Sequence, residues 1–214
     1  MNRACLPELL DSLAPDHPDA VHNRRDLRLI NRFMRNRRWF EAALAPVMRG
    51  AGPALEIGAG IGDMALGLGE RGLPVDGLDL WPRPRGWPAD RQWHVADLRT
   101  FDGYGAYPVV IGNLIFHQFT EAELAALGAK LRPSARAIFA CEPERRRSSQ
   151  LFMAAVAPLF GANYVTLHDA HVSVKAGFQG DELPRALGLD DGAWQYSCTT
   201  TALGVNRMSA IRNS

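Results

Sequence analysis

A glycine-rich turn directly after a buried strand is the feature that most constrains the fold of this chain. The run Ala54–Ile57 predicts a short buried strand, and Gly58, Gly60 and Gly62 follow it at once. A strand that enters such a turn and then a helix is typical of a parallel α/β sheet. In sheets of this kind, ligands bind at the carboxyl ends of the strands.

The glycine spacing separates two classes of nucleotide ligand. A dinucleotide-binding turn reads G-x-G-x-x-G, and its third glycine lies where the pyrophosphate meets the helix N-terminus. Asp63 stands at that position here, and its carboxylate would repel a phosphate. The turn therefore favours a nucleoside that carries a zwitterionic amino acid, such as S-adenosylmethionine, over NAD.

Alternating strand and helix patterns predict one α/β domain behind a helical cap. The 214 residues suffice for one such domain with a short appendage. We predict a doubly wound, mostly parallel, Rossmann-like sheet of seven strands that closes with an antiparallel hairpin. Residues 1–50 are expected to form the N-terminal helical cap, and residues 51–214 the domain. The strands are expected at 54–57, 74–79, 92–95, 109–112, 135–141, 194–201 and 205–211.

Helical patterns fill most of the intervals. They cover 7–13, 20–48 with a break near Asn36, 64–71, 120–131, 148–160 and 181–187. Residues 161–180 are expected to be irregular, and the proline-rich stretch 81–88 to replace a helix by a loop. The apolar residues of the 148–160 helix are expected to pack mostly in the core; they are Phe152, Met153, Val156, Leu159 and Phe160.

Composition excludes several classes of protein. A net charge of +1 gives the whole chain no attraction for nucleic acid. The arginine-rich face of the 20–48 helix allows a nucleic-acid or anionic-membrane surface, but the near-neutral chain favours a solvated face. Cys5, Cys141 and Cys198 are too scattered for a disulfide framework or a zinc site. No run is long enough to cross a bilayer and no signal peptide is evident, so a cytoplasmic location is expected.

Acidic residues near the ends of the first three strands fit the polar groups of the expected ligand. Glu56 can accept a hydrogen bond from its ammonium, directly or through water. Asp79, 23 residues later, has two oxygens that suit the two ribose hydroxyls, and Asp97 can accept from the adenine amino group. Dinucleotide enzymes also use an acid at the position of Asp79. The alternative for Glu56 and Asp97 is a plain helix-capping or loop acid, so the order of these positions carries the prediction.

The other cofactor-binding candidates are glycines, apolar residues and an amide. At Gly58, Gly60 and Gly62 a Cβ would fill the space that the methionine part needs. Leu98, with Leu80 or Trp81, can enclose the adenine ring. The predicted cofactor-binding residues are Glu56, Gly58, Ala59, Gly60, Gly62, Asp79, Leu80, Asp97, Leu98 and Asn113.

These segments resemble the motifs of class I S-adenosylmethionine-dependent methyltransferases. Glu56–Gly62 matches the first motif, E/D-x-G-x-G-x-G, and Ala96–Leu98 matches the third. Gly112–Phe119 resembles the fourth-strand exit of the small-molecule branch, and the C-terminal hairpin matches the antiparallel seventh strand. The resemblance covers roughly residues 50–211 and implies S-adenosylmethionine as the cofactor.

A narrower resemblance concerns the acceptor. Leu29–Arg32 and His168–Lys175 are similar to segments of methyltransferases found beside type III polyketide synthases, in a group that resembles quinone methyltransferases. The enzymes of this group use N-terminal helices to close over the cofactor, which implies contact from Asn31 or Arg32. Two features depart from the pattern: the helix after the second strand is missing, and Gln118 stands where a second histidine is usual.

Three residues are the catalytic candidates. Methyl transfer from a sulfonium is an in-line displacement, so a base is needed only where the acceptor loses a proton. His117, just past the fourth strand, is the expected base; the alternative is a helix-entry or cofactor-packing residue. His168 and Asp169, with His171 nearby, are expected to form a catalytic or substrate-binding cluster, with a solvated loop as the alternative. We predict no metal, because the spacing lacks helical i, i+4 histidine ligands.

The sequence therefore predicts a methyltransferase that acts on an oxygen or carbon of a small, lipophilic, phenolic or polyketide-like acceptor. A nucleic-acid methyltransferase is the first alternative, although the exit Asn113–Phe116 lacks the N-P-P-Y type signature of amino-directed base methylation. A NAD-dependent oxidoreductase is disfavoured by Asp63. A non-catalytic S-adenosylmethionine-binding module stays open.

Overall fold

One seven-stranded sheet forms the centre of the protein. The computed structural model describes residues 2–14, 16–50, 52–156 and 161–213, without the side chains of 152–156. The strand order is β3-β2-β1-β4-β5-β7-β6. The strands are β1 Ala54–Ile57, β2 Val75–Asp79, β3 Trp93–Val95, β4 Val109–Asn113, β5 Ala137–Pro143, β6 Trp194–Thr200 and β7 Val205–Arg212. The predicted fold is confirmed.

The strand directions place the carboxyl ends of β1 to β5 along one edge. These strands pair in parallel, whereas β7 runs antiparallel to both β5 and β6. Because β1 pairs with both β2 and β4, the order of the strands reverses there, and the crevice outside this point is where open α/β sheets bind ligands.

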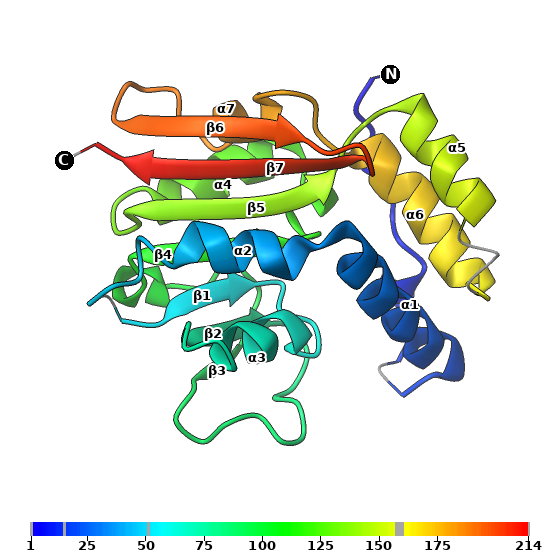
Figure 1. The fold of residues 1–214 in the computed structure, drawn as a ribbon, viewed down its shortest axis with the longest axis horizontal. Helices are drawn as coiled ribbons and strands as arrows, with labels where there is room; N and C mark the ends of the chain where they lie inside the picture. The colour runs from blue at the N-terminus through cyan, green and yellow to red at the C-terminus, as the bar shows by residue number, and fades with distance from the viewer. Residues whose placement is uncertain (1, 15, 51, 157–160, 214) are drawn as a thin grey trace.

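Two apolar layers hold the helices on the sheet. Alternate side chains of a strand point to opposite faces, so Leu55 packs with α4 and α7 while its neighbour Ala54 packs with α2 and α3. The elements α1, α5 and α6 lie beyond the carboxyl ends of the parallel strands (Figure 1). The α-helices are α1 Pro18–Met34, α2 Asn36–Leu44, α3 Asp63–Gly69, α4 Glu121–Leu131, α5 Arg147–Val156, α6 Tyr164–Ala176 and α7 Glu182–Ala186.

Single 3-10 turns form three short connections: η1 Leu10–Ser12, η2 Gly103–Ala106 and η3 Phe116–Gln118. The helix expected over 7–13 is thus wrong in extent, since only η1 forms there. The stretch 81–88 has no helix, as predicted. No helix of the described ranges is long and apolar enough to cross a membrane.

The expectation that residues 161–180 are irregular is wrong, because α6 forms there. The Asn163 side chain caps its start by accepting a hydrogen bond from the Thr166 backbone N–H at 3.0 Å. The helix contacts α1, α5 and η3. Because it meets neighbours on several sides, its apolar residues form no single stripe, and the sequence shows no clear helical period.

The break in the long N-terminal helix falls one residue before the expected position. Arg35 adopts a left-handed conformation with φ of 55° between α1 and α2. Such a conformation costs a non-glycine residue about 1–2 kcal/mol. Past this elbow, Phe40 and Leu44 of α2 are fully buried against the sheet. The division into a cap of residues 1–50 and a domain of residues 51–214 stays a prediction.

The side-chain packing expected for Phe152, Met153, Val156, Leu159 and Phe160 lies outside the described residues.

Candidate functional site

A cavity of about 1250 Å³ lies at the carboxyl edge of the sheet. Its walls come from the glycine-rich turn, the ends of β2 and β4, the helices α1 and α6, and the N-terminal segment. All of the predicted site residues lie in the described part of the chain. The cavity is lined by Glu56, Gly58, Ala59, Gly60, Asp79, Leu80, Asp97, Leu98, Asn113, His117 and Asp169, but not by Gly62 or His168.

The three glycines of the turn all have positive φ angles, but the surroundings of a side chain at each position differ. A Cβ on Gly58 would lie 2.4 Å from the Ile115 side chain, and one on Gly62 would lie 2.4 Å from the Trp87 ring. A Cβ on Gly60 would meet no atom within 4 Å. Gly58 and Gly62 are therefore required by internal packing, whereas Gly60 borders open space in the cavity.

Asp79 ties the glycine turn to the end of β2. Its Oδ2 accepts a hydrogen bond from the Gly60 backbone N–H at 2.7 Å, and its Oδ1 accepts from the Trp81 backbone N–H at 2.9 Å. Burial raises the pKa of the Asp79 carboxyl, although these amides oppose the shift. The carboxylate is thus oriented at the cavity wall, with lone pairs left for further donors.

Glu56 is a buried acid beneath the same turn. Its Oε2 accepts a hydrogen bond from the Ala65 backbone N–H of α3 at 3.0 Å. Burial, aided by the charges of Asp79 and Asp63, raises the pKa of Glu56 to about 8. The group therefore gains from a cation at the cavity wall, because a positive neighbour stabilises its ionised form.

The expected adenine end has one wall already occupied by an ion pair. The Asp97 carboxylate binds the Arg99 guanidinium at 2.6 Å, and hydrogen bonds from Arg99 lower the Asp97 pKa. Leu98 is almost fully buried, while Leu80 is exposed at the opening. The Arg24 guanidinium stacks over the Trp81 ring at 4.8 Å.

Three amide side chains join the N-terminal helices to the sheet. Asn36 Nδ2 donates to Asn31 Oδ1 at 3.1 Å and to Asn113 Oδ1 at 3.0 Å. Asn113 Nδ2 donates in turn to Asn31 Oδ1 at 3.1 Å. Asn31 and Asn113 line the cavity, so this network fixes the α1–α2 elbow over the end of β4.

His117 is a buried imidazolium held between two carboxylates. Its Nδ1 lies 2.7 Å from Glu142 Oε2, and its Nε2 lies 3.2 Å from Glu8 Oε1. Burial alone would lower the pKa of His117, but Glu142 and then Glu8 hold it at about 10. Both ring nitrogens are engaged, so His117 carries its proton at neutral pH. A role as a general base would require that Glu8 leave Nε2 and that the imidazolium first lose its proton.

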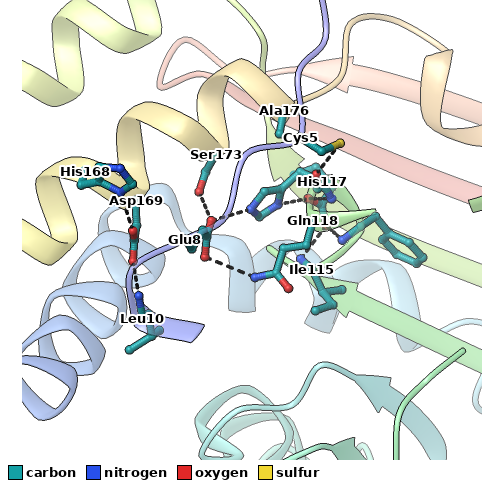
Figure 2. A network of polar contacts seen from close by, with 12 residues as sticks. Cys5, Glu8, Leu10, Ile115, His117, Gln118, His168, Asp169, Ser173 and Ala176 are labelled. Atoms are coloured by element: carbon teal, nitrogen blue, oxygen red, sulfur yellow. Dashed lines mark hydrogen bonds and ion pairs between the residues drawn. The ribbon is translucent and has the colours of Figure 1, made fainter. Parts of the chain in front are cut away.

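Glu8 connects this imidazolium to α6 and η3. Figure 2 shows its carboxylate directed toward Ser173, His117 and Gln118, and the Ser173 hydroxyl and the Gln118 amide both donate to it. Burial would raise the pKa of Glu8, but the hydrogen bond and charge of His117 outweigh it and lower the pKa. Glu142 is fixed as well, because it accepts from the backbone N–H groups of Ile115 and Phe116.

Asp169 anchors the N-terminal segment, which we call the strap (residues 3–11). Its carboxylate accepts from the Leu9 backbone N–H at 2.7 Å, and from the Leu10 backbone N–H at 3.1 Å (Figure 2). His168 lies beside Asp169 at 3.0 Å but is exposed. The structure thus brings His117 and Asp169 to the same cavity and leaves His168 outside it.

Asp11 of the strap is a cavity-lining acid that the sequence did not single out. Burial, with the charges of Glu8 and Asp169, raises its pKa to about 6. In the described part of the chain its carboxylate makes no hydrogen bond, so it is available to a ligand near neutral pH. No group of three or more histidine, cysteine, aspartate or glutamate side chains in this part is arranged to hold a metal ion.

Glu142 could have been found from the sequence, because it is an acid near the end of a strand, as Asp79 is. Glu8 and Asp11 had no such signal: Glu8 meets His117, which is 109 residues away, and Asp11 reaches the cavity only through the course of the strap.

Comparison with known proteins gives likeness of structure only. No family model and no curated protein matches the sequence. The plantazolicin methyltransferase BpumL in complex with SAH superposes with a TM-score of 0.70 at 13% identity, over 93% of this chain and 92% of that one. Magnesium protoporphyrin IX methyltransferase from Synechocystis PCC 6803 gives 0.54 at 17% identity, over 84% and 82%.

Human N-acetylserotonin methyltransferase in complex with SAM gives a TM-score of 0.64 at 11% identity, over 95% of this chain and 61% of that one. The resemblance to class I methyltransferases is thus confirmed at the level of the fold.

Proposed function

We propose that the protein is an S-adenosylmethionine-dependent methyltransferase acting on a small acceptor. The observation that carries the proposal is the Asp79 carboxylate, which is bonded to Gly60 at the carboxyl edge of β1 and β2. It lies in a cavity lined by all the other predicted cofactor-binding residues except Gly62. Several solved proteins of this fold are described as SAM or SAH complexes of methyltransferases, which supports the same cofactor here.

The cavity residues fit the parts of this cofactor. The space above Gly60 is open, and the N-terminus of α3 supplies amides for a carboxylate. Glu56 gains from the ammonium, and Asp79 has acceptor capacity for ribose hydroxyls. Leu80 and Leu98 are proposed to contact the adenine, and Asp97 its amino group.

When bound, S-adenosylmethionine supplies an electrophilic methyl group on a sulfonium. The contribution of the chain is alignment of the acceptor and exclusion of water, which supply much of the rate of such a displacement. The strap and α6 close the cavity beside β4, so we place the acceptor there. An oxygen or carbon of a lipophilic, phenolic or polyketide-like molecule is the acceptor we propose.

The catalytic roles of His117, His168 and Asp169 stay proposals. His117 has the better placement, since it lines the cavity and carries a charge that orients polar groups. For Asp169 the contacts support a positioning role through the strap.

Calorimetric titration with S-adenosylmethionine, S-adenosylhomocysteine and NADH tests the cofactor. We expect micromolar-range binding of the first two, none of NADH, and loss of binding in Asp79→Ala. The matched control is Asp90→Ala, which removes an exposed acid of the loop after β2 and is expected to bind normally. Preference for NADH, or equal binding by both variants, would refute the assignment.

A further inference from the structure

A row of arginines lines one wall of the cavity. Arg24, Arg28 and Arg32 of α1 are spaced four residues apart, and Arg35 follows at the elbow, so they share one face of the helix. All four line the cavity, as does Arg38 in the first turn of α2. The row therefore borders the cavity, although most of its arginines are also exposed to solvent.

The charges of this row are only partly compensated. Arg28 Nη1 lies 3.3 Å from Asp63 Oδ2 at the start of α3. The guanidinium groups of Arg32, Arg35 and Arg38 make no hydrogen bond or ion pair with any residue of the described ranges, and all three residues are exposed toward solvent or the cavity. Three neighbouring cations at one rim repel each other and attract an anion.

The backbone that carries these arginines is held in a defined conformation. Arg35 holds a left-handed conformation, a position where glycine is the usual residue at a helix end. The amide network of Asn31, Asn36 and Asn113 bonds both sides of the elbow to β4. The guanidinium groups thus project from a defined site, and their planar forks match carboxylate and phosphate oxygens.

We propose that Arg32, Arg35 and Arg38 bind an anionic group, a carboxylate or a phosphate, of the acceptor. This inference rests on the proposed function and adds the chemical class of the substrate. The strap and α6, which also line the cavity, carry the acids Glu8, Asp11 and Asp169. The arginine row is therefore distinct from the acidic groups of the same cavity, and we expect an anionic group of the acceptor to be held by the arginines and kept away from these acids.

The test measures binding of 1-hydroxy-2-naphthoate, its methyl ester and pyrophosphate by calorimetry, with and without saturating S-adenosylhomocysteine. We expect the wild type to bind the naphthoate and pyrophosphate, and Arg32→Gln and Arg38→Gln each to weaken both by about tenfold. The ester is expected to bind equally to all variants. Arg25→Gln is the matched control, because Arg25 is an exposed arginine of α1 that does not line the cavity.

The other outcomes overturn the proposal in distinct ways. An equal loss in Arg25→Gln and Arg32→Gln indicates a general surface field, as for nucleic acid or an anionic membrane. A loss of S-adenosylhomocysteine affinity in Arg32→Gln assigns the row to the cofactor. If the wild type binds neither the naphthoate nor pyrophosphate, the proposed anion site is refuted. Absence of S-adenosylhomocysteine binding alone refutes the proposed function, while the pyrophosphate arm still reports on the arginines.

Discussion

Replacing Glu8 by glutamine is expected to lower both the pKa of His117 and the stability of the fold. Glu8 and Glu142 hold the pKa of this buried histidine at about 10, against an ordinary value of 6.5. By linkage, such a shift stabilises the folded state by roughly 4 kcal/mol at pH 7. Because Glu142 has the larger effect, Glu8→Gln is expected to remove the smaller part of the pKa shift and to cost about 1–2 kcal/mol.

The pH dependence has a definite sign. A raised histidine pKa stabilises the fold fully below pH 6.5, and the stabilisation is lost as the pH rises toward about 10. The wild type therefore loses more stability than Glu8→Gln between pH 7 and pH 9.5. The difference between the two proteins is largest at neutral pH and shrinks as the imidazole deprotonates.

The assay combines an NMR titration of the histidine Cε1–H signals, assigned with His117→Gln, with urea unfolding at pH 7 and 9.5. Gln118→Ala is the control, because it removes a neutral donor to Glu8 without changing a charge. A His117 signal that titrates near pH 6.5 in the wild type would refute the reasoning. So would an unchanged pKa in Glu8→Gln.

Two further predictions concern the glycine turn and the acid beneath it. Gly60→Ala is expected to keep the fold at a cost of about 1–2 kcal/mol but to lose S-adenosylhomocysteine affinity. Gly62→Ala, which drives a Cβ into Trp87, is expected to destabilise by about 2–4 kcal/mol in thermal unfolding; the reverse pattern would contradict the roles assigned to the two glycines. Glu56 has a pKa of about 8, and it must ionise to form an ion pair with the ammonium of the ligand. The affinity for S-adenosylhomocysteine is therefore expected to rise between pH 6 and 7.5 by up to about tenfold per pH unit. Glu56→Gln should remove that slope, and calorimetry that shows an unchanged slope would exclude the contact.

The strands and the edge of the cavity formed by the glycine turn could be predicted because their signals are local. A parallel strand buried on both faces reads as a short apolar run, as in Ala54–Ile57, and glycine or proline bounds it. An acid at the end of such a run, such as Asp79, lies at the ligand edge by topology alone. Even there, the sequence did not show that Gly62 is required by Trp87, because that contact depends on a distant loop.

The side of the cavity formed by the strap and α6 could not be predicted, because its contacts join distant parts of the chain. The strap meets η3 and α6 more than 100 residues away, and no periodicity marks such pairs. The helix α6 was missed for a related reason, since packing on several sides removes the apolar stripe. The sequence pointed to His117 as a site residue, but it did not show that His117 is charged, because that charge depends on Glu8 and Glu142.

The strap also bears on the order in which the molecule is assembled. Leu9 bonds to Asp169 across 160 residues, and the Ala4 backbone N–H bonds to the Lys175 carbonyl. During synthesis the strap leaves the ribosome long before α6 is made. Its contacts with α6 therefore cannot form while β1 to β4 are folding. Contacts of such long sequence separation are slow to close. We therefore expect the nascent chain to form the glycine-turn edge of the sheet first and to dock the strap on α6 last.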